Sequence, residues 1–192
     1  MNNKAGGYMK GLIIVGDLFE DVEFIAPLDV WRRNKDDIVV ASMMKRKTVI
    51  SKLGIEMTVD ALIEEVNLEE FDFLFIPGGP GAFKILNTLP KVNEIINYFA
   101  NSHKLVTAIC AAPMLIGRLG YLKDKNYTVH PGFEDQIIEG NYLRDKGVVK
   151  DQNFITGKSM YYAIDLALEV VRFFYGDKHT QILLESLQGK MK

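Results

Sequence analysis

The sequence predicts one α/β domain, built on a mainly parallel sheet with helices on both faces. Segments with strand character alternate along the chain with segments whose apolar residues recur at helical spacing. Several strand segments consist almost entirely of apolar residues, which is typical of strands that are covered on both sides. The length of 192 residues suits a single domain with one substantial core.

The strands are predicted where apolar and β-branched residues dominate short runs. Main strands are expected at residues 10–15, 38–42, 73–76, 105–109 and 127–130. Residues 48–50 and 56–59 are expected to form a small hairpin or edge pair around Gly54, and residues 148–156 a hairpin about a polar turn. The breaker cluster Pro77-Gly78-Gly79-Pro80-Gly81 predicts a tight loop directly after the strand at 73–76.

The helices are predicted between these strands. Helical spacing of apolar residues indicates helices at residues 23–34, 92–102, 112–117 and 161–175. Pro113 suits the first turn of its helix, where the missing N–H costs nothing. Gly176 is expected to end the long last helix. Residues 1–9 are interpreted as a loose leader, so that residues 10–192 form the domain.

Composition and charge exclude several classes of protein. Lys and Arg total 23 against 25 Asp and Glu, which gives a formal net charge of −2, so nucleic acid is not an expected partner. No apolar run approaches the length of a membrane span, and no secretory signal opens the chain. A single cysteine cannot form an internal disulfide, which favours a reducing cytoplasm.

Motifs for cofactors and metals are also missing from the sequence. Gly157-Lys158-Ser159 resembles the end of a phosphate-binding loop, but Gln152 stands where that loop needs a glycine. No G-x-G-x-x-G follows Gly16, so a dinucleotide fingerprint is absent. Three histidines and one cysteine without close pairing do not suggest a metal site. No cofactor and no metal are therefore expected.

Cys110 is the strongest candidate for chemistry. It stands where the apolar strand at 105–109 meets small residues that begin a helix, which is the pattern of a nucleophile elbow. The backbone N–H groups of such a turn point at its apex side chain, so the thiol is expected to ionise more readily than a free cysteine. The alternative is a buried structural cysteine, because free Cys is among the most buried residue types.

Three other features could assist a cysteine. Glu23 lies near the start of the first helix and could point its carboxyl at the thiol, although an acid there is also favoured by the helix dipole alone. His130 precedes a Pro-Gly turn that could present its side chain to a crevice. The alternative interpretation is that His130 is a structural residue. The Gly78-Gly79 pair lets the backbone approach a ligand closely and offers it N–H donors. Alternatively, the two glycines only provide the positive φ that the turn needs.

These candidates converge on one edge of the predicted sheet. Gly16, Gly78, Cys110 and His130 each fall at the carboxyl end of a predicted strand. In open α/β sheets, ligands bind beyond the carboxyl ends of the strands. The sequence therefore predicts a crevice at this edge that contains all four positions.

The combination of motifs resembles the ThiJ/PfpI family. The resemblance is carried by Glu20-Asp21-Val22-Glu23, the following Pro27-Leu28-Asp29-Val30-Trp31, the Ile76-Pro77-Gly78-Gly79 turn, Ala108-Ile109-Cys110-Ala111-Ala112-Pro113 and His130-Pro131. The matches run in order from about Gly11 to Gly176. This resemblance implies a flavodoxin-like three-layer sandwich, membership of the class I glutamine amidotransferase-like superfamily and a homodimer.

The resemblance also implies a role for each site residue. Cys110 would be the nucleophile or the oxidisable thiol, and Glu23 a protonated carboxyl that hydrogen-bonds its sulfur. The N–H groups of Gly79 and Ala111 would form an anion pocket. His130 would lie nearby, and Asp29 would approach that histidine across the dimer interface.

Three departures from related sequences narrow the function. Ala111 stands where the protease-like branch has a histidine, so peptidase activity is not expected. Glutamine amidotransferases have a His-x-Glu motif late in the chain, and here the corresponding residues are His179-Thr180-Gln181. Because the glutamate is missing, glutamine amidotransferase activity is not expected. Ser159-Met160-Tyr161 replaces a Gly-Pro-Gly segment of many relatives, which leaves the shape of the pocket and the substrate open.

Two functions are compatible with these residues. The first is a cysteine-dependent enzyme that acts on small reactive aldehydes such as methylglyoxal, or on their early protein adducts, in the manner of a glutathione-independent glyoxalase or deglycase. The second is a non-catalytic redox-sensing or stress-protective protein that uses an oxidisable Cys110. The expected partner is accordingly a small carbonyl compound or an oxidant.

Overall fold

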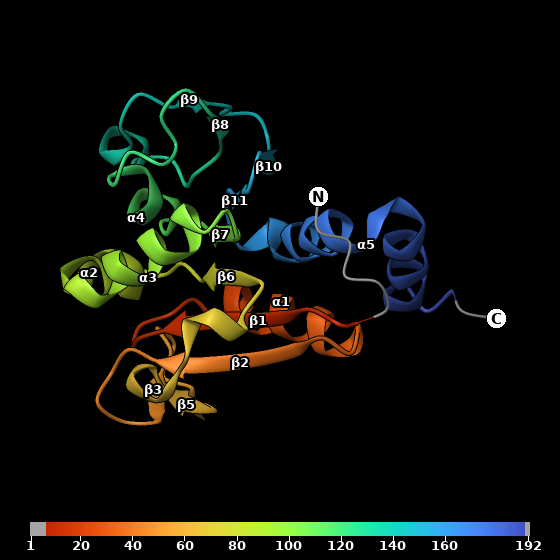
Figure 1. Cartoon of the computed structure of the whole chain (residues 1–192), viewed down its shortest axis with the longest axis horizontal. Coiled ribbons are helices and arrows are strands. Elements are labelled where there is room, and N and C mark those ends of the chain that lie inside the picture. Colours follow the sequence, from red (N-terminus) through yellow and green to blue (C-terminus); the bar gives the residue numbers. More distant parts are fainter. Residues whose placement is uncertain (1–6, 191–192) are drawn as a thin grey trace.

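The computed structural model describes residues 7–190, and its main sheet has seven strands (Figure 1). These strands are β1 (Lys10–Val15), β2 (Asp37–Ser42), β5 (Ala61–Leu62), β6 (Phe73–Ile76), β7 (Leu105–Ile109), β10 (Val148–Asp151) and β11 (Phe154–Gly157). Two smaller sheets pair β3 (Thr48–Ile50) with β4 (Glu56–Thr58), and β8 (Asn126–Tyr127) with β9 (Asn141–Tyr142). The helices are α1 (Asp21–Arg33), α2 (Pro80–Lys84), α3 (Pro90–Asn101), α4 (Pro113–Gly117) and α5 (Ala163–Leu187).

The main sheet confirms the predicted fold class. Its strand order is β10-β11-β7-β6-β1-β2-β5, and every neighbouring pair is parallel except the β10–β11 hairpin. Without the two edge strands β5 and β10, the strands follow the chain order 2-1-3-4-5, which is the flavodoxin-like order. The predicted hairpins at β3–β4 and β10–β11 are confirmed as antiparallel pairs.

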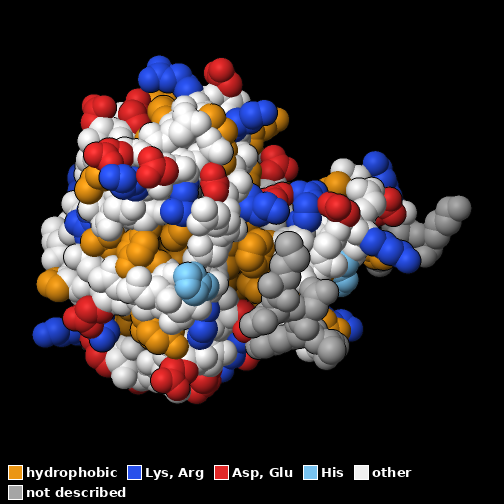
Figure 2. Space-filling view, turned by 45° about the horizontal axis from the view of Figure 1, so that its top comes forward, with side chains coloured by type: hydrophobic (Ala, Val, Ile, Leu, Met, Phe, Trp, Pro, Cys, Tyr) orange, Lys and Arg blue, Asp and Glu red, His pale blue; other side chains and the backbone are white. Residues whose placement is uncertain are grey.

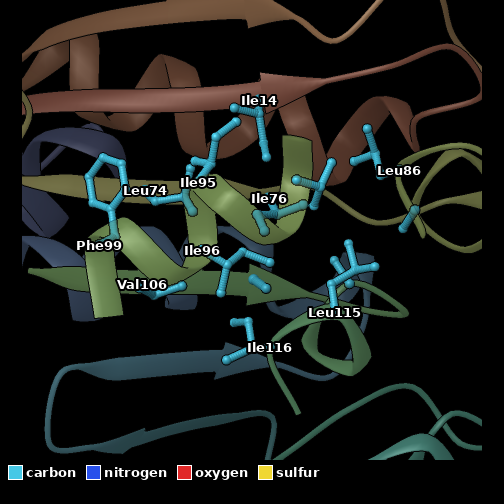
Figure 3. Packing of buried hydrophobic residues seen from close by; sticks show 14 of the residues in the cluster. Ile14, Leu74, Ile76, Leu86, Ile95, Ile96, Phe99, Val106, Leu115 and Ile116 are labelled. Atoms are coloured by element: carbon cyan, nitrogen blue, oxygen red, sulfur yellow. The ribbon is translucent and has the colours of Figure 1, made fainter. Parts of the chain in front are cut away.

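Alternation along the strands explains why apolar residues occupy successive positions. Leu12 and Ile14 belong to the core on one face of the sheet, whereas Ile13 and Val15 belong to the core on the other face. The first core is closed by α3 and α4, as the contacts of Ile14, Leu74 and Ile76 with helix residues show (Figure 3). The second core is closed by α1 and α5, so both faces of the sheet are buried.

Two sequence predictions about strands and loops are wrong. The strand expected at 127–130 is reduced to β8, outside the main sheet, because Thr128 bonds to side chain and loop atoms instead of a strand ladder: its N–H donates to Thr156 Oγ1 and its hydroxyl to Lys146 O. The loop expected at 77–81 is shorter than predicted, because Pro80 already begins α2.

The last helix also departs from the prediction. It begins at Ala163, after a turn of 3-10 helix at Met160–Tyr162, and continues to Leu187 beyond a kink at Gly176. Gly176 has φ 80° and ψ 175°, a non-helical conformation, so the first helical stretch ends there as predicted and a second stretch continues to Leu187. Across residues 7–190, no helix is long and apolar enough to cross a membrane.

Most of the predicted leader lies outside the described residues. Residues 1–6 belong to that part of the chain, whereas Met9 is buried in the core next to α1 and α5. Its N–H donates to the hydroxyl of Tyr175 at 2.9 Å. The packed structure therefore includes the residue that the prediction placed at the end of the leader.

Candidate active site

The sharp turn after β7 places Cys110 at the carboxyl edge of the sheet. Cys110 has φ 62°, in the left-handed region that residues with a side chain rarely adopt, and α4 begins three residues later at Pro113. Its N–H donates to Gly157 O at 2.9 Å, which ties the turn to the end of β11. The cysteine is half-buried. The predicted nucleophile elbow is therefore present as backbone geometry.

Two glycines allow the loop after β6 to pass directly beside the cysteine. A Cβ atom added to Gly78 would lie 2.3 Å from Glu23 Oε2 and 2.6 Å from Cys110 Cβ. Gly79 has φ 90°, and a Cβ atom there would lie 2.5 Å from the backbone nitrogen of Glu20. Both positions need glycine, because any side chain would collide with groups that form the site.

Glu23 enters the site from the first turn of α1. The side chain is 2 % exposed, and its Oε2 atom is buried with no hydrogen-bond partner among the described residues. The start of the helix is fixed against the glycine loop, since the N–H of Glu20 donates to Gly78 O at 3.2 Å. The carboxyl of Glu23 and the thiol of Cys110 thus lie close together, both beside Gly78.

Burial dominates the electrostatics of this pair. Burial raises the pKa of Glu23 to about 7, against hydrogen bonding with Cys110 and the charge of Lys52, which lower it. Burial likewise raises the pKa of the Cys110 thiol to about 12, and the negative charge of Glu23 raises it further, whereas the N–H groups of Gly79 and Ala111 lower it. The lowered thiol pKa predicted from the sequence is wrong, because burial and the carboxylate outweigh two N–H donors.

The two pKa values describe one coupled pair that shares a proton. Because both pKa values are raised, the pair holds one proton and a single negative charge once the pH exceeds the raised pKa of Glu23. That charge resides either on the carboxylate beside a neutral thiol or on the thiolate beside a neutral carboxyl. The second arrangement provides a nucleophilic sulfur next to a proton donor.

His130 and Asp29 occupy different positions relative to this pair. The N–H of His130 donates to Cys110 O at 2.8 Å, so the residue lies beside the elbow although it does not end a strand of the main sheet. Its ring is exposed, and Nδ1 lies 3.0 Å from Pro131 O. Asp29 is exposed on α1 and pairs with Arg33 Nε at 2.7 Å. An approach of Asp29 to a histidine of a second subunit stays a prediction.

Lys52 was not singled out from the sequence. It lies in the turn between β3 and β4, and its Nζ donates to Glu20 Oε2 at 2.6 Å. No local motif marks this lysine, because its position depends on how the hairpin packs against the loop before α1. Among residues 7–190, no group of three or more His, Cys, Asp or Glu side chains could hold a metal ion.

Comparisons with known proteins cover nearly the whole chain. The family model of the DJ-1/PfpI family matches residues 9–173. A deglycase of Pyrococcus abyssi is 36% identical over 78% of this chain and 90% of its own length, and a glutathione-independent glyoxalase of Caenorhabditis elegans is 30% identical over 88% and 89%. The solved structure of oxidized Toxoplasma gondii DJ-1 superposes with a TM-score of 0.86 at 25% identity, over 94% of this chain and 98% of that one.

Proposed function

This chain belongs to the DJ-1/PfpI family, and from that premise we propose that it is a cysteine-dependent enzyme acting on small reactive aldehydes or their early protein adducts. The observation that carries the proposal is that the buried carboxyl of Glu23 and the side chain of Cys110 both lie against Gly78, where an added Cβ atom would be 2.3 Å from Glu23 Oε2 and 2.6 Å from Cys110 Cβ. A sulfur with a proton donor on one side and two N–H groups on the other is equipped to attack a carbonyl carbon.

The proposed reaction begins with addition of the sulfur to an aldehyde. With methylglyoxal, the thiolate of Cys110 forms a C–S bond to the aldehyde carbon, and the carbonyl electron pair moves to oxygen. Glu23 gives its proton to that oxygen, which yields a hemithioacetal. The N–H groups of Gly79 and Ala111, which lower the pKa of the thiol, would stabilise the developing negative charge.

The later steps move a proton and add water. A base, Glu23 or His130, removes the proton from the carbon that carries sulfur, and a proton returns to the neighbouring carbon to give a thioester. Water then hydrolyses the thioester, which releases lactate and restores the thiol. The aldehyde carbon is oxidised and the ketone carbon is reduced, so the reaction needs no external electron carrier.

Lactate formation from methylglyoxal tests this function. The purified protein should produce lactate without glutathione, and Cys110→Ser should lose that activity. His130→Asn should be slower than the wild type, whereas His103→Asn is the matched control, because His103 is exposed and lies before β7, at the opposite end of the strand from Cys110. Full activity in Cys110→Ser would reject the mechanism.

We also propose that the protein is a homodimer. Four large apolar side chains are exposed near the site: Val22 and Ile25 on the outer face of α1, and Leu53 and Ile55 between β3 and β4. An apolar surface of this kind favours association with a second copy. Light scattering after size-exclusion chromatography should show a dimer for the wild type and a monomer for Ile25→Lys. A monomeric wild type would end this part of the proposal.

Redox sensing is the second candidate function. Cys110 is the chain's single cysteine. The solved structure of the relative Toxoplasma gondii DJ-1 is of its oxidized form. Hydrogen peroxide would transfer an oxygen to the sulfur with loss of water, and the N–H groups of Gly79 and Ala111 would face the new negative charge. Intact mass after mild peroxide should show oxygen gained by the wild type and not by Cys110→Ser. A cytoplasmic location fits either function, since a free thiol needs a reducing compartment.

A further inference from the structure

Lys52 brings a positive charge to the loops that form the candidate site. Its backbone N–H donates to Phe19 O at 2.9 Å, and its ammonium donates to Glu20 Oε2 at 2.6 Å. Glu20 is in turn bonded through its N–H to Gly78 O, the residue between Glu23 and Cys110. The hairpin β3–β4 thus delivers a cation to the same short segment that begins α1.

The charge of Lys52 acts on the reactive pair. The hydrogen bond to Glu20 is the largest of the effects that raise the pKa of Lys52, and negative charges on Glu23 and Cys110 raise it as well. The side chain of Lys52 is 41% exposed, whereas that of Glu20 is 12% exposed. The side chain of Lys52 is therefore more exposed to solvent than that of its partner Glu20, which is mostly buried.

This position matters because the carboxyl of Glu23, once ionised, places a negative charge beside Cys110. An electrophile with its own negative charge would be repelled by Glu23 and Cys110 as it approached the sulfur. A cation at the rim of the site offsets that repulsion. Figure 2 shows acidic and basic side chains interspersed over the face that it displays.

We infer that Lys52 is a specificity-determining residue that makes the site favour electrophiles with a negative charge close to the reacting carbon. This inference rests on the proposed function, in which the Cys110 sulfur attacks a small carbonyl compound. The favoured substrates are then 2-oxoaldehydes that carry a carboxylate or another anionic group. Neutral aldehydes of the same size gain nothing from Lys52.

Alkylation of Cys110 tests the inference without any turnover. Iodoacetate and iodoacetamide have similar size and react in the same way: the sulfur forms a C–S bond and iodide leaves. They differ in charge, so the ratio of their second-order rates reports how the site treats an anion. Replacing Lys52 with methionine should lower the iodoacetate-to-iodoacetamide ratio by about threefold to fivefold, the range expected for one partly exposed charge.

Two further variants control for changes in reactivity or folding. Lys10→Met is the matched control, because Lys10 also pairs with a carboxylate, Glu70, but lies at the amino end of β1 away from the site. Its ratio should equal that of the wild type. Glu20→Gln leaves the Lys52 ammonium free and removes a negative charge, so its ratio should rise.

The outcomes separate this inference from the proposed function. An unchanged ratio in Lys52→Met, or a fall of equal size in Lys10→Met, would overturn the role of Lys52. If Lys52→Met does not fold, a ratio in Glu20→Gln at or below the wild-type value would overturn it. A protein that forms no lactate yet shows the expected ratios would lose the proposed enzyme activity and keep Lys52 as the residue that selects anionic electrophiles.

Discussion

The buried carboxyl of Glu23 should make the folded protein less stable as the pH rises from acidic to neutral. Burial raises the pKa of Glu23 from 4.5 to about 7. Between these values the folded state holds a proton that the unfolded chain has lost, so the free energy of unfolding falls as pH rises. Below 4.5 both states are protonated, and above about 7 both are ionised and the loss is complete.

The size of this effect follows from the shift. A difference of about 2.5 pKa units corresponds to about 3.4 kcal/mol at 1.36 kcal/mol per unit. Integrated between pH 5 and pH 8, the loss is about 2.5 kcal/mol, because part of the change has already occurred at pH 5. Glu23→Gln cannot titrate, so the variant should escape this loss.

Urea unfolding of the wild type and Glu23→Gln at pH 5 and pH 8 measures the effect. The free energy of unfolding of the wild type, relative to the variant, should fall by about 2.5 kcal/mol between the two pH values. The comparison cancels the other titrating groups that the two proteins share. A difference that stays constant, or that changes in the opposite direction, would refute the electrostatic account of the site.

Three further perturbations test the site and the core. Iodoacetamide should alkylate Cys110 with a rate that rises around pH 7 to a plateau, and Glu23→Gln should lack that inflection; identical profiles would contradict the shared proton. Gly78→Ala should separate the carboxyl from the thiol and cost about 1–3 kcal/mol of stability, visible as loss of the inflection and a lower urea midpoint. Trp31→Ala should cost about 3–5 kcal/mol in urea unfolding, because Trp31 is fully buried and its Nε1 donates to Ala167 O; a cost under 1 kcal/mol would show that the core does not need it.

Most of the fold could be predicted from local patterns. The strands β1, β6 and β7 are short runs made mostly of apolar residues, and such runs are typical of strands between two covering layers. The strand expected at 127–130 failed, because the same pattern also suits a segment whose polar groups bond to Thr156 and to loop atoms. Local sequence cannot distinguish these partners, since they come from distant parts of the chain.

The elbow at Cys110 and the glycine pair at Gly78 and Gly79 follow from local sequence, since sharp turns and positive φ depend on residues that are neighbours in the chain. The chemical behaviour of these groups depends instead on tertiary packing. Burial against the sheet raises the pKa of Glu23, and hairpin packing brings Lys52 to the site. Desolvation and charge act through space, so they depend on which distant segments the fold brings together.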